Sequence, residues 1–210
     1  KPNQRITLIG SGFTTGGSAT INSSGDGSSI AIGGASIATA KINDGSSVTI
    51  DNGGSWSSSV DLPVIAATTA GGAVDLKVTD SSGRFGTVSL TFPTRELTIT
   101  PTEGRVGTQV SVVGANFPAK NDEGESVTVT VQYDAGTNKT NSTTVVPDAS
   151  GNFTASVQVP TNASIPSDNT VKVSFEDANS ITVYTTSTHN VPSATIALSK
   201  DAGPVGTVVT

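Results

Sequence analysis

The chain has 210 residues, a net charge of −6 and no cysteine. Its 11 lysines and arginines are scattered singly, so no basic stripe is present for a nucleic acid or an anionic membrane. The absence of cysteine excludes disulfides, a thiol nucleophile and a cysteine-based zinc site. No apolar run approaches the roughly 18 residues of a membrane span. A chain that is acidic, rich in Ser and Thr and free of cysteine is typical of microbial cell surfaces, and we expect an extracellular location.

The sequence contains one domain twice. "DNGGSWSSSVDLP" at residues 51–63 matches "DASGNFTASVQVP" at residues 148–160 with an offset of 97 positions, and "VDLKVTD" matches "VKVSFED" with the same offset. "LIGSGF" and "VVGANF" correspond at an offset of 104 positions. A phrase order that recurs at nearly constant spacing indicates a tandem repeat.

Each copy alternates apolar and polar residues with a period of two, as in "VTVTVQY" and "FTASVQV". This pattern is typical of strands that are buried on one face. Turn residues such as "NDG", "DSSG" and "DAGTN" separate the strands. The sequence therefore predicts an all-β protein of two antiparallel sandwiches, each of about seven strands. We expect the aromatics that recur at equivalent positions to lie in the two cores: Phe13, Trp56, Phe117 and Phe153.

The phrase "P-x-x-G-x-V-G-T-x-V-x-V-x-G-x-x-F" at residues 101–117 resembles the opening of immunoglobulin-like domains of the IPT/TIG kind. The phrase "D-x-x-G-x-F-x-x-x-x-x-V-P" at residues 148–160 resembles the middle of repeats in microbial surface proteins. Together they cover most of the second copy. The resemblance implies two tandem immunoglobulin-like sandwiches in a surface-layer (S-layer) or extracellular filament subunit. A Gly/Ser-rich insertion at residues 14–35 departs from this pattern in the first copy.

The two copies start at different points of the repeat. The second copy opens with a first strand and a crossover between the sheets, whose apolar residues are Leu97, Ile99, Val106 and Val110. The first copy begins later, at Ile6 and Leu8, which correspond to Val110 and Val112. The missing phrase recurs at the end of the chain, where its apolar residues are Ile196, Leu198, Val205 and Val209. We therefore predict a sandwich over 1–93 that lacks its first strand, a complete sandwich over 94–193, and the first strand of a third sandwich over 194–210.

Three arrangements would complete the first sandwich and use the tail. In one, the tail is donated to Ile6 and Leu8 of another copy of the chain, which gives a head-to-tail homopolymer or lattice. In another, residues 1–210 are a window of a longer tandem protein, whose next domain continues past Thr210. In the third, the tail folds back onto its own chain, which requires the sandwiches to lie side by side because seventeen extended residues span only about 56 Å.

One loop is a candidate cation site. Asp122, Glu123 and Glu125 fall within "NDEGES", and such carboxylates could bind calcium. The alternative is a solvated acidic loop without a ligand. No other cofactor is expected.

Five N-x-S/T sequons could carry glycans in a secreted chain, although a composition this rich in Ser and Thr produces several by chance. Asn138 and Asn141 share a loop that we expect to be exposed, and the others are Asn22, Asn152 and Asn162. His189 is the only histidine, and we expect it to be a solvated linker residue. No catalytic constellation is present, so we expect no enzyme activity.

These features favour a structural protein of the microbial cell surface that assembles into an S-layer or extracellular filament. The alternative is an adhesin stalk, or a carbohydrate- or ligand-binding module, of a longer surface protein. A sugar-binding face needs exposed aromatic platforms, and few aromatics remain outside the predicted cores.

Overall fold

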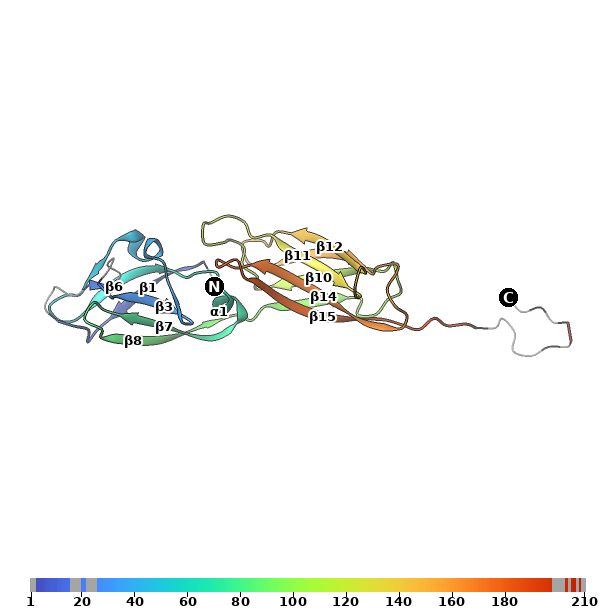
Figure 1. Cartoon of the computed structure of the whole chain (residues 1–210), viewed down its shortest axis with the longest axis horizontal. Coiled ribbons are helices and arrows are strands. Elements are labelled where there is room, and N and C mark those ends of the chain that lie inside the picture. Colours follow the sequence, from blue (N-terminus) through green and yellow to red (C-terminus); the bar gives the residue numbers. More distant parts are fainter. Residues whose placement is uncertain are drawn as a thin grey trace.

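The alternating segments form strands, and the chain is all-β as predicted. The computed structural model describes residues 3–15, 20–21, 26–197, 203, 205–206 and 208. Two β-sandwiches lie end to end along the long axis, and the described part of the tail extends beyond the second (Figure 1). The first contains β1 (Arg5–Gly10), β2 (Thr20–Ile21), β3 (Ser29–Ile32), β4 (Ala35–Ser36), two 3-10 turns (Thr39–Lys41 and Asn43–Gly45), β5 (Val48–Thr49), β6 (Trp56–Asp61), α1 (Ala66–Ala70), β7 (Gly72–Thr79) and β8 (Phe85–Phe92).

The second sandwich follows the predicted seven-strand plan. Its strands are β9 (Glu96–Thr100), β10 (Gln109–Ala115), β11 (Val129–Asp134), β12 (Thr140–Val145), β13 (Phe153–Gln158), β14 (Ser167–Glu176) and β15 (Thr182–Val191). A three-stranded sheet of order β13-β10-β9 and a four-stranded sheet of order β12-β11-β14-β15 enclose its core. After β9 the chain crosses to the other sheet, where Glu103 forms a parallel bridge with Asn190 of β15.

The first sandwich repeats this plan except at the edge of β1 and in a small added sheet. Its four-stranded sheet has the order β4-β3-β7-β8, equivalent to β12-β11-β14-β15, and β1 pairs with β6 as β10 pairs with β13. The second copy also places β9 beside β10. Among the described residues of the first copy, no strand occupies the corresponding place beside β1.

The Gly/Ser-rich insertion contributes to the first core through a small additional sheet. The last part of residues 14–35 forms β3, the counterpart of β11. The added part includes β2, which pairs with β5. Ile21 of β2 is completely buried. The insertion therefore adds packing on one side of the first sandwich, which the second copy lacks.

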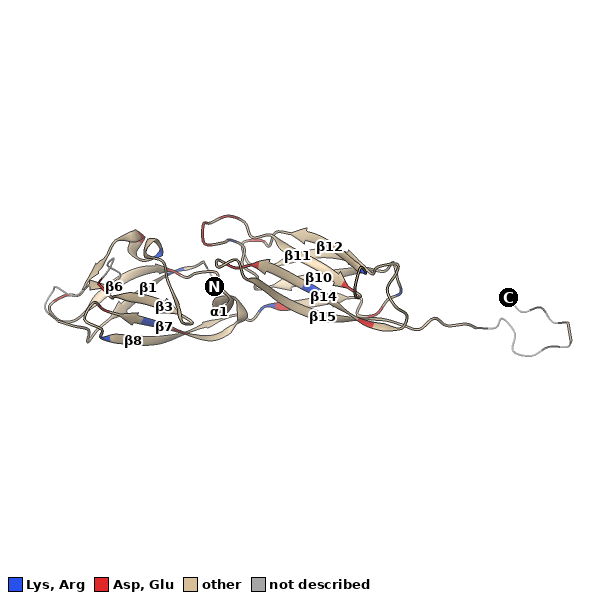
Figure 2. Ribbon diagram, in the orientation of Figure 1, with Lys and Arg blue, Asp and Glu red and all other residues tan. Residues whose placement is uncertain are grey.

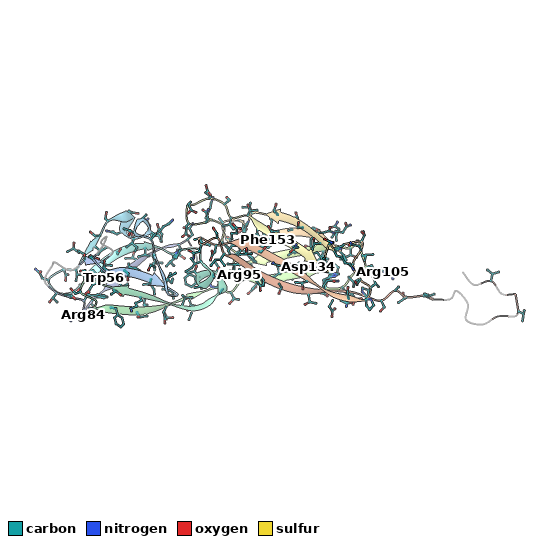
Figure 3. The ribbon with its side chains drawn as sticks, viewed as in Figure 1. Trp56, Arg84, Arg95, Arg105, Asp134 and Phe153 are labelled. Carbon is teal, nitrogen blue, oxygen red and sulfur yellow. The ribbon has the colours of Figure 1, made fainter. Side chains whose placement is uncertain are left out.

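The predicted core aromatics are confirmed, and each copy stacks one of them on a glycine. Gly10 lies opposite Trp56, and Gly114 lies opposite Phe153. A Cβ atom on either glycine would lie only 2.1 or 2.2 Å from the facing ring. Figure 3 labels Trp56 in the first sandwich and Phe153 in the second. Glycine is required at both places because the facing ring occupies the space that a Cβ atom would need.

The repeated "D-x-x-G" phrase is a turn closed by its own carboxylate. Asp51 and Asp148 each accept two backbone N–H hydrogen bonds, at 2.8–2.9 Å, from residues two and four positions ahead. The glycine of the second turn, Gly151, has a φ of 84° and lies where a Cβ would be 2.4 Å from the carbonyl oxygen of Phe117. Its own carbonyl accepts the N–H of Phe117, at 3.0 Å. Left-handed backbone and close approach both demand glycine there.

The prediction of His189 as a solvated linker residue is wrong. The last strand, β15, continues to Val191, and His189 is completely buried within it. Its Nδ1 atom is hydrogen-bonded to Tyr133 Oη, at 2.8 Å. Burial lowers the pKa of His189, an effect that the nearby Glu103 carboxylate opposes, and burial raises the pKa of Tyr133. The histidine is therefore a neutral core residue that is partnered by a phenol.

Candidate functional site

Two parts of the molecule are candidates for function: the junction between the sandwiches and the uncovered edge of β1. The sandwiches are connected covalently by residues 93–95. A second contact joins them, because the segment between β6 and α1 reaches into the second sandwich. Val64 of this segment is 1 % exposed and belongs to the second core, whereas Ile65 belongs to the first. Two separate attachments restrict bending and rotation more than one linker can.

Hydrogen bonds hold this segment on the second sandwich. The N–H of Val64 donates to Asp122 Oδ1, at 2.7 Å, and the carbonyl of Val64 accepts the N–H of Ala178, at 2.8 Å. The N–H of Ala66 donates to Asp177 Oδ2, at 3.0 Å. Within the first sandwich, the Thr68 hydroxyl of α1 donates to the carbonyl of Pro63, at 2.6 Å. The backbone of the segment is thus bound by both sandwiches.

A difference between the repeats explains why one carboxylate oxygen is free for the junction. In the first copy, Asp80 Oδ2 accepts the N–H of Thr14, at 3.0 Å. The equivalent of Thr14 in the second copy is Pro118, which has no N–H to donate. Asp177, the counterpart of Asp80, instead accepts the N–H of Ala66. The proline therefore converts a contact within one sandwich into a contact between two.

The covalent connection is also tightly packed. The Asn116 side-chain amide donates to the carbonyl of Thr94, at 2.8 Å. A Cβ on Gly71, whose φ is 87°, would lie 2.4 Å from the Cα of Thr94. Arg95, labelled in Figure 3, places its guanidinium 5.5 Å from the centre of the Phe175 ring, and burial lowers its pKa.

The acidic loop belongs to this junction. Asp122 binds the N–H of Val64, and its carbonyl oxygen accepts a hydrogen bond from Lys41 Nζ. Glu125 accepts a hydrogen bond from the side-chain amide of Asn121, at 3.2 Å, and the Glu123 side chain is exposed. The structure thus gives the three predicted calcium ligands separate surroundings. Among the described residues, no group of three or more His, Asp or Glu is placed to hold a metal ion.

The uncovered edge of β1 borders an apolar groove. The groove has a volume of about 220 Å³ and runs between β1 and β8. Its lining includes Leu8, Ile9, Trp56, Leu76, Val78 and Val88. In the second sandwich the corresponding space is filled by β9, which pairs with β10 and contacts β15.

The structure locates only some of the predicted donor and acceptor residues. Ile6 and Leu8 lie on β1 as expected, with Leu8 buried and Ile6 half-buried. Ile196 and Val205 of the tail are fully exposed. The other two predicted donor residues, Leu198 and Val209, lie outside the described residues.

The sequons differ in accessibility. Asn138 and Asn162 have exposed side chains, although the Asn162 amide donates to the carbonyl of Asn138, at 3.2 Å. Asn141 is half-buried and donates to the carbonyl of Gln158, at 2.8 Å. Asn152 is exposed, and Asn22 lies outside the described residues. Among the described sequons, Asn138 and Asn152 therefore combine an exposed side chain with an amide nitrogen that donates no hydrogen bond to the rest of the described chain.

The described surface shows neither a charged patch nor a group of exposed aromatic rings that would bind a ligand. Figure 2 shows acidic and basic residues dispersed over both sandwiches. Phe85 and Tyr184 are exposed, but they lie on different sandwiches, and the ammonium groups of Lys77 and Lys172 lie over their rings. No helix in the described part of the chain is long and apolar enough to cross a membrane.

No protein-family model matches the sequence, and comparison with curated proteins gives no match. Among solved structures, a tetra-tandem repeat in the extending region of a large adhesion protein is 14% identical with a TM-score of 0.36, over 90% of this chain and 46% of that one. A Ca2+-stabilized adhesin that helps an Antarctic bacterium reach out and bind ice is 21% identical with a TM-score of 0.30, over 94% of this chain and 46% of that one. A DUF3823 family protein from Bacteroides ovatus is 16% identical with a TM-score of 0.30, over 90% and 98% of the two chains. The chain spans less than half of the length of those two adhesin chains.

Proposed function

We propose that the chain is a non-catalytic structural spacer of a microbial cell surface, a rigid rod segment of an extracellular stalk. The observation that carries this proposal is the double junction, in which Val64 packs into the second core while residues 93–95 connect the sandwiches covalently. A spacer must transmit position and force along its length. Binding at two points serves this purpose because it opposes both bending and twisting.

The cost of opening the junction supports this role. Separating the sandwiches would expose Val64 and leave its N–H, together with that of Ala66, without the carboxylates of Asp122 and Asp177. Exposing a buried valine costs roughly 1.5–3 kcal/mol, and exchanging each hydrogen bond to a carboxylate for one to water costs about 1.5–3 kcal/mol. These costs favour the end-to-end arrangement over other relative orientations of the two sandwiches.

A second candidate, assembly into a filament or an S-layer, is favoured by a different observation. The edge of β1 is uncovered and borders an apolar groove, whereas β-proteins usually protect their edges. A groove that accepts a strand from a neighbour would turn the spacer into a polymer subunit.

Immunogold labelling of intact cells of the source organism, combined with negative-stain microscopy, tests the proposal. We expect label on surface stalks, filaments or a surface layer before lysis. Label that becomes accessible only after lysis would overturn the surface role. Label on separate stalks that form no regular array favours the spacer role alone. Label on a regular filament or lattice favours assembly.

A further inference from the structure

We propose that the groove beside β1 binds residues 193–199 of a second copy of the chain as an added antiparallel strand. This inference deepens the proposed structural function and rests on it. It joins chains head to tail through the first sandwich of one copy and the tail of the next.

The second sandwich shows what an occupied groove looks like. There β9 pairs with β10 in the register Val112 with Ile99, Val113 with Thr98 and Gly114 with Leu97. Ile99 is 4% exposed, and Leu97 packs against the same core. One strand thus covers the sheet edge and places its apolar side chains in the core.

Side chains at the equivalent edge of the first sandwich lack this cover. Ile9 is 81% exposed, whereas its counterpart Val113 is 44% exposed. Val88, on the opposite wall of the groove, is 48% exposed. Trp56 Nε1 is buried and has no hydrogen-bond partner among the described residues, although buried polar groups are nearly always paired. An apolar surface beside an unpaired sheet edge fits an added strand.

The sequence of the tail identifies the occupant. Residues 195–199 repeat β9 at an offset of 99 positions, so Ile196 corresponds to Leu97 and Leu198 to Ile99. Transferring the β9 register to β1 places Leu198 opposite Leu8, Ala197 opposite Ile9 and Ile196 opposite Gly10. Ile196 and Leu198 would then fill the positions of Leu97 and Ile99, and the small Ala197 would lie beside the exposed Ile9.

A second copy is the supplier because the tail leads away from the groove of its own chain. Residues 192–197 continue from the end of β15, on the side of the second sandwich that lies away from the first (Figure 1). Residues 193–197 are all exposed. A neighbour placed end to end presents its first sandwich to this tail. Such a contact uses two different surfaces and produces open assemblies unless a rotation closes a ring.

Cysteine cross-linking tests the contact and its register, because the natural chain contains no cysteine. One 210-residue chain carries only Ile9→Cys, and a second carries only Ala197→Cys. Both positions are exposed, so neither substitution disturbs a core. The two chains are mixed under mild oxidation and separated on a non-reducing gel, and a chain with Ser193→Cys replaces the second partner as the register control.

We expect at least ten times more heterodimer with Ala197→Cys than with Ser193→Cys. Equal yields from the two partners, or no heterodimer, would overturn the proposal. In the double variant I9C/A197C, we expect a ladder of oligomers. A fast-migrating monomer with an internal cross-link would instead show that the tail occupies the groove of its own chain and would overturn the second copy as occupant.

The only tryptophan gives an independent measurement, since Trp56 lines the groove. A synthetic peptide of residues 193–210 is titrated into the 210-residue chain that carries I196D and L198D, so that the tail of the chain does not compete. We expect a saturable change in Trp56 emission, and no change with a peptide that carries the same two aspartates. No response to the natural peptide would overturn the strand site. Surface labelling and junction rigidity do not depend on this contact, so a failure here is distinguishable from a failure of the spacer role.

Discussion

Val64 and Ile65 are neighbours in the chain, but their side chains lie in different hydrophobic cores. Val64 packs in the second sandwich and Ile65 in the first. Successive side chains of an extended segment point in opposite directions, so a segment that passes between two sandwiches can anchor in both. Pro63 and the short helix α1 flank this anchor, and the Thr68 hydroxyl fixes the carbonyl of Pro63. The junction therefore belongs to both cores.

Truncation of Val64 should destabilise the second sandwich although the residue lies between strands of the first. We expect V64A to lower the free energy of unfolding by roughly 1.5–3 kcal/mol, from lost burial and a cavity. Urea unfolding followed by circular dichroism measures the effect, and Trp56 fluorescence follows the first sandwich separately. The matched control is V146A, because Val146 is 50% exposed, and it should change stability by less than about 0.5 kcal/mol. Equal effects of the two substitutions would contradict the shared core.

Loss of the Asp122 carboxylate should weaken the junction rather than a metal site. D122A leaves the N–H of Val64 without its acceptor, at a cost of about 1–3 kcal/mol. The neighbouring exposed carboxylate provides the control, E123A, which should have little effect. Thermal melts with and without a chelator check the cause. A loss of stability in D122A that occurs only in the presence of calcium would support a cation site and contradict the junction role.

Close contact between Gly114 and the Phe153 ring should make even a methyl group costly. G114A puts a Cβ 2.2 Å from the ring, and overpacking of this kind costs typically about 1–3 kcal/mol. The double variant G114A/F153L provides space for the methyl group, so its loss of stability should be smaller than the sum of the two single losses. Additive losses, measured by urea unfolding in a double-mutant cycle, would show that the two residues do not interact.

The buried His189 should make the second sandwich sensitive to acid. Its pKa is lowered by burial, so below about pH 6.5, the ordinary value, the unfolded chain takes up a proton that the folded chain resists. Stability should therefore fall as the pH drops from about 6.5 and level off below the pKa of the folded state. H189N removes the titrating imidazole. The unfolding free energy of this variant should therefore not show the fall below about pH 6.5 that His189 causes. Parallel pH profiles of H189N and the natural chain between pH 7 and 5 would refute the assignment.

The sequence predicts most of the fold because repetition reveals it. Alternation with a period of two identifies the strands, and the offsets of 97 and 104 positions align Trp56 with Phe153 and Phe13 with Phe117 before any coordinates are known. The same alignment predicts that residues 1–93 contain no counterpart of β9, and among the described residues no strand lies there beside β1. His189 could also have been found, because it alternates in phase with Val183 and Val191, and all three are buried on β15.

The junction could not be predicted from sequence patterns. Asp122 stands in an acidic loop, and its hydrogen-bond donor is a backbone N–H 58 positions earlier, in the other copy. Every residue except proline has a backbone N–H, so the residue type does not reveal which N–H is the donor. Pro118 carries the one recognisable signal, because proline in place of Thr14 frees the oxygen that Asp177 uses on Ala66. That signal becomes meaningful only when the contact of Asp80 with Thr14 is known.

The distance between two spin labels, one on each sandwich, tests the rigid rod most directly. S57C on β6 and S142C on β12 provide exposed attachment points in a chain with no other cysteine. Pulsed electron–electron double resonance should give one narrow distance distribution. The same labels in a chain that also carries D122A and D177A should give a broader one, because both carboxylates that bind the segment are lost. A broad or multi-peaked distribution in the chain with the intact junction would contradict the rod.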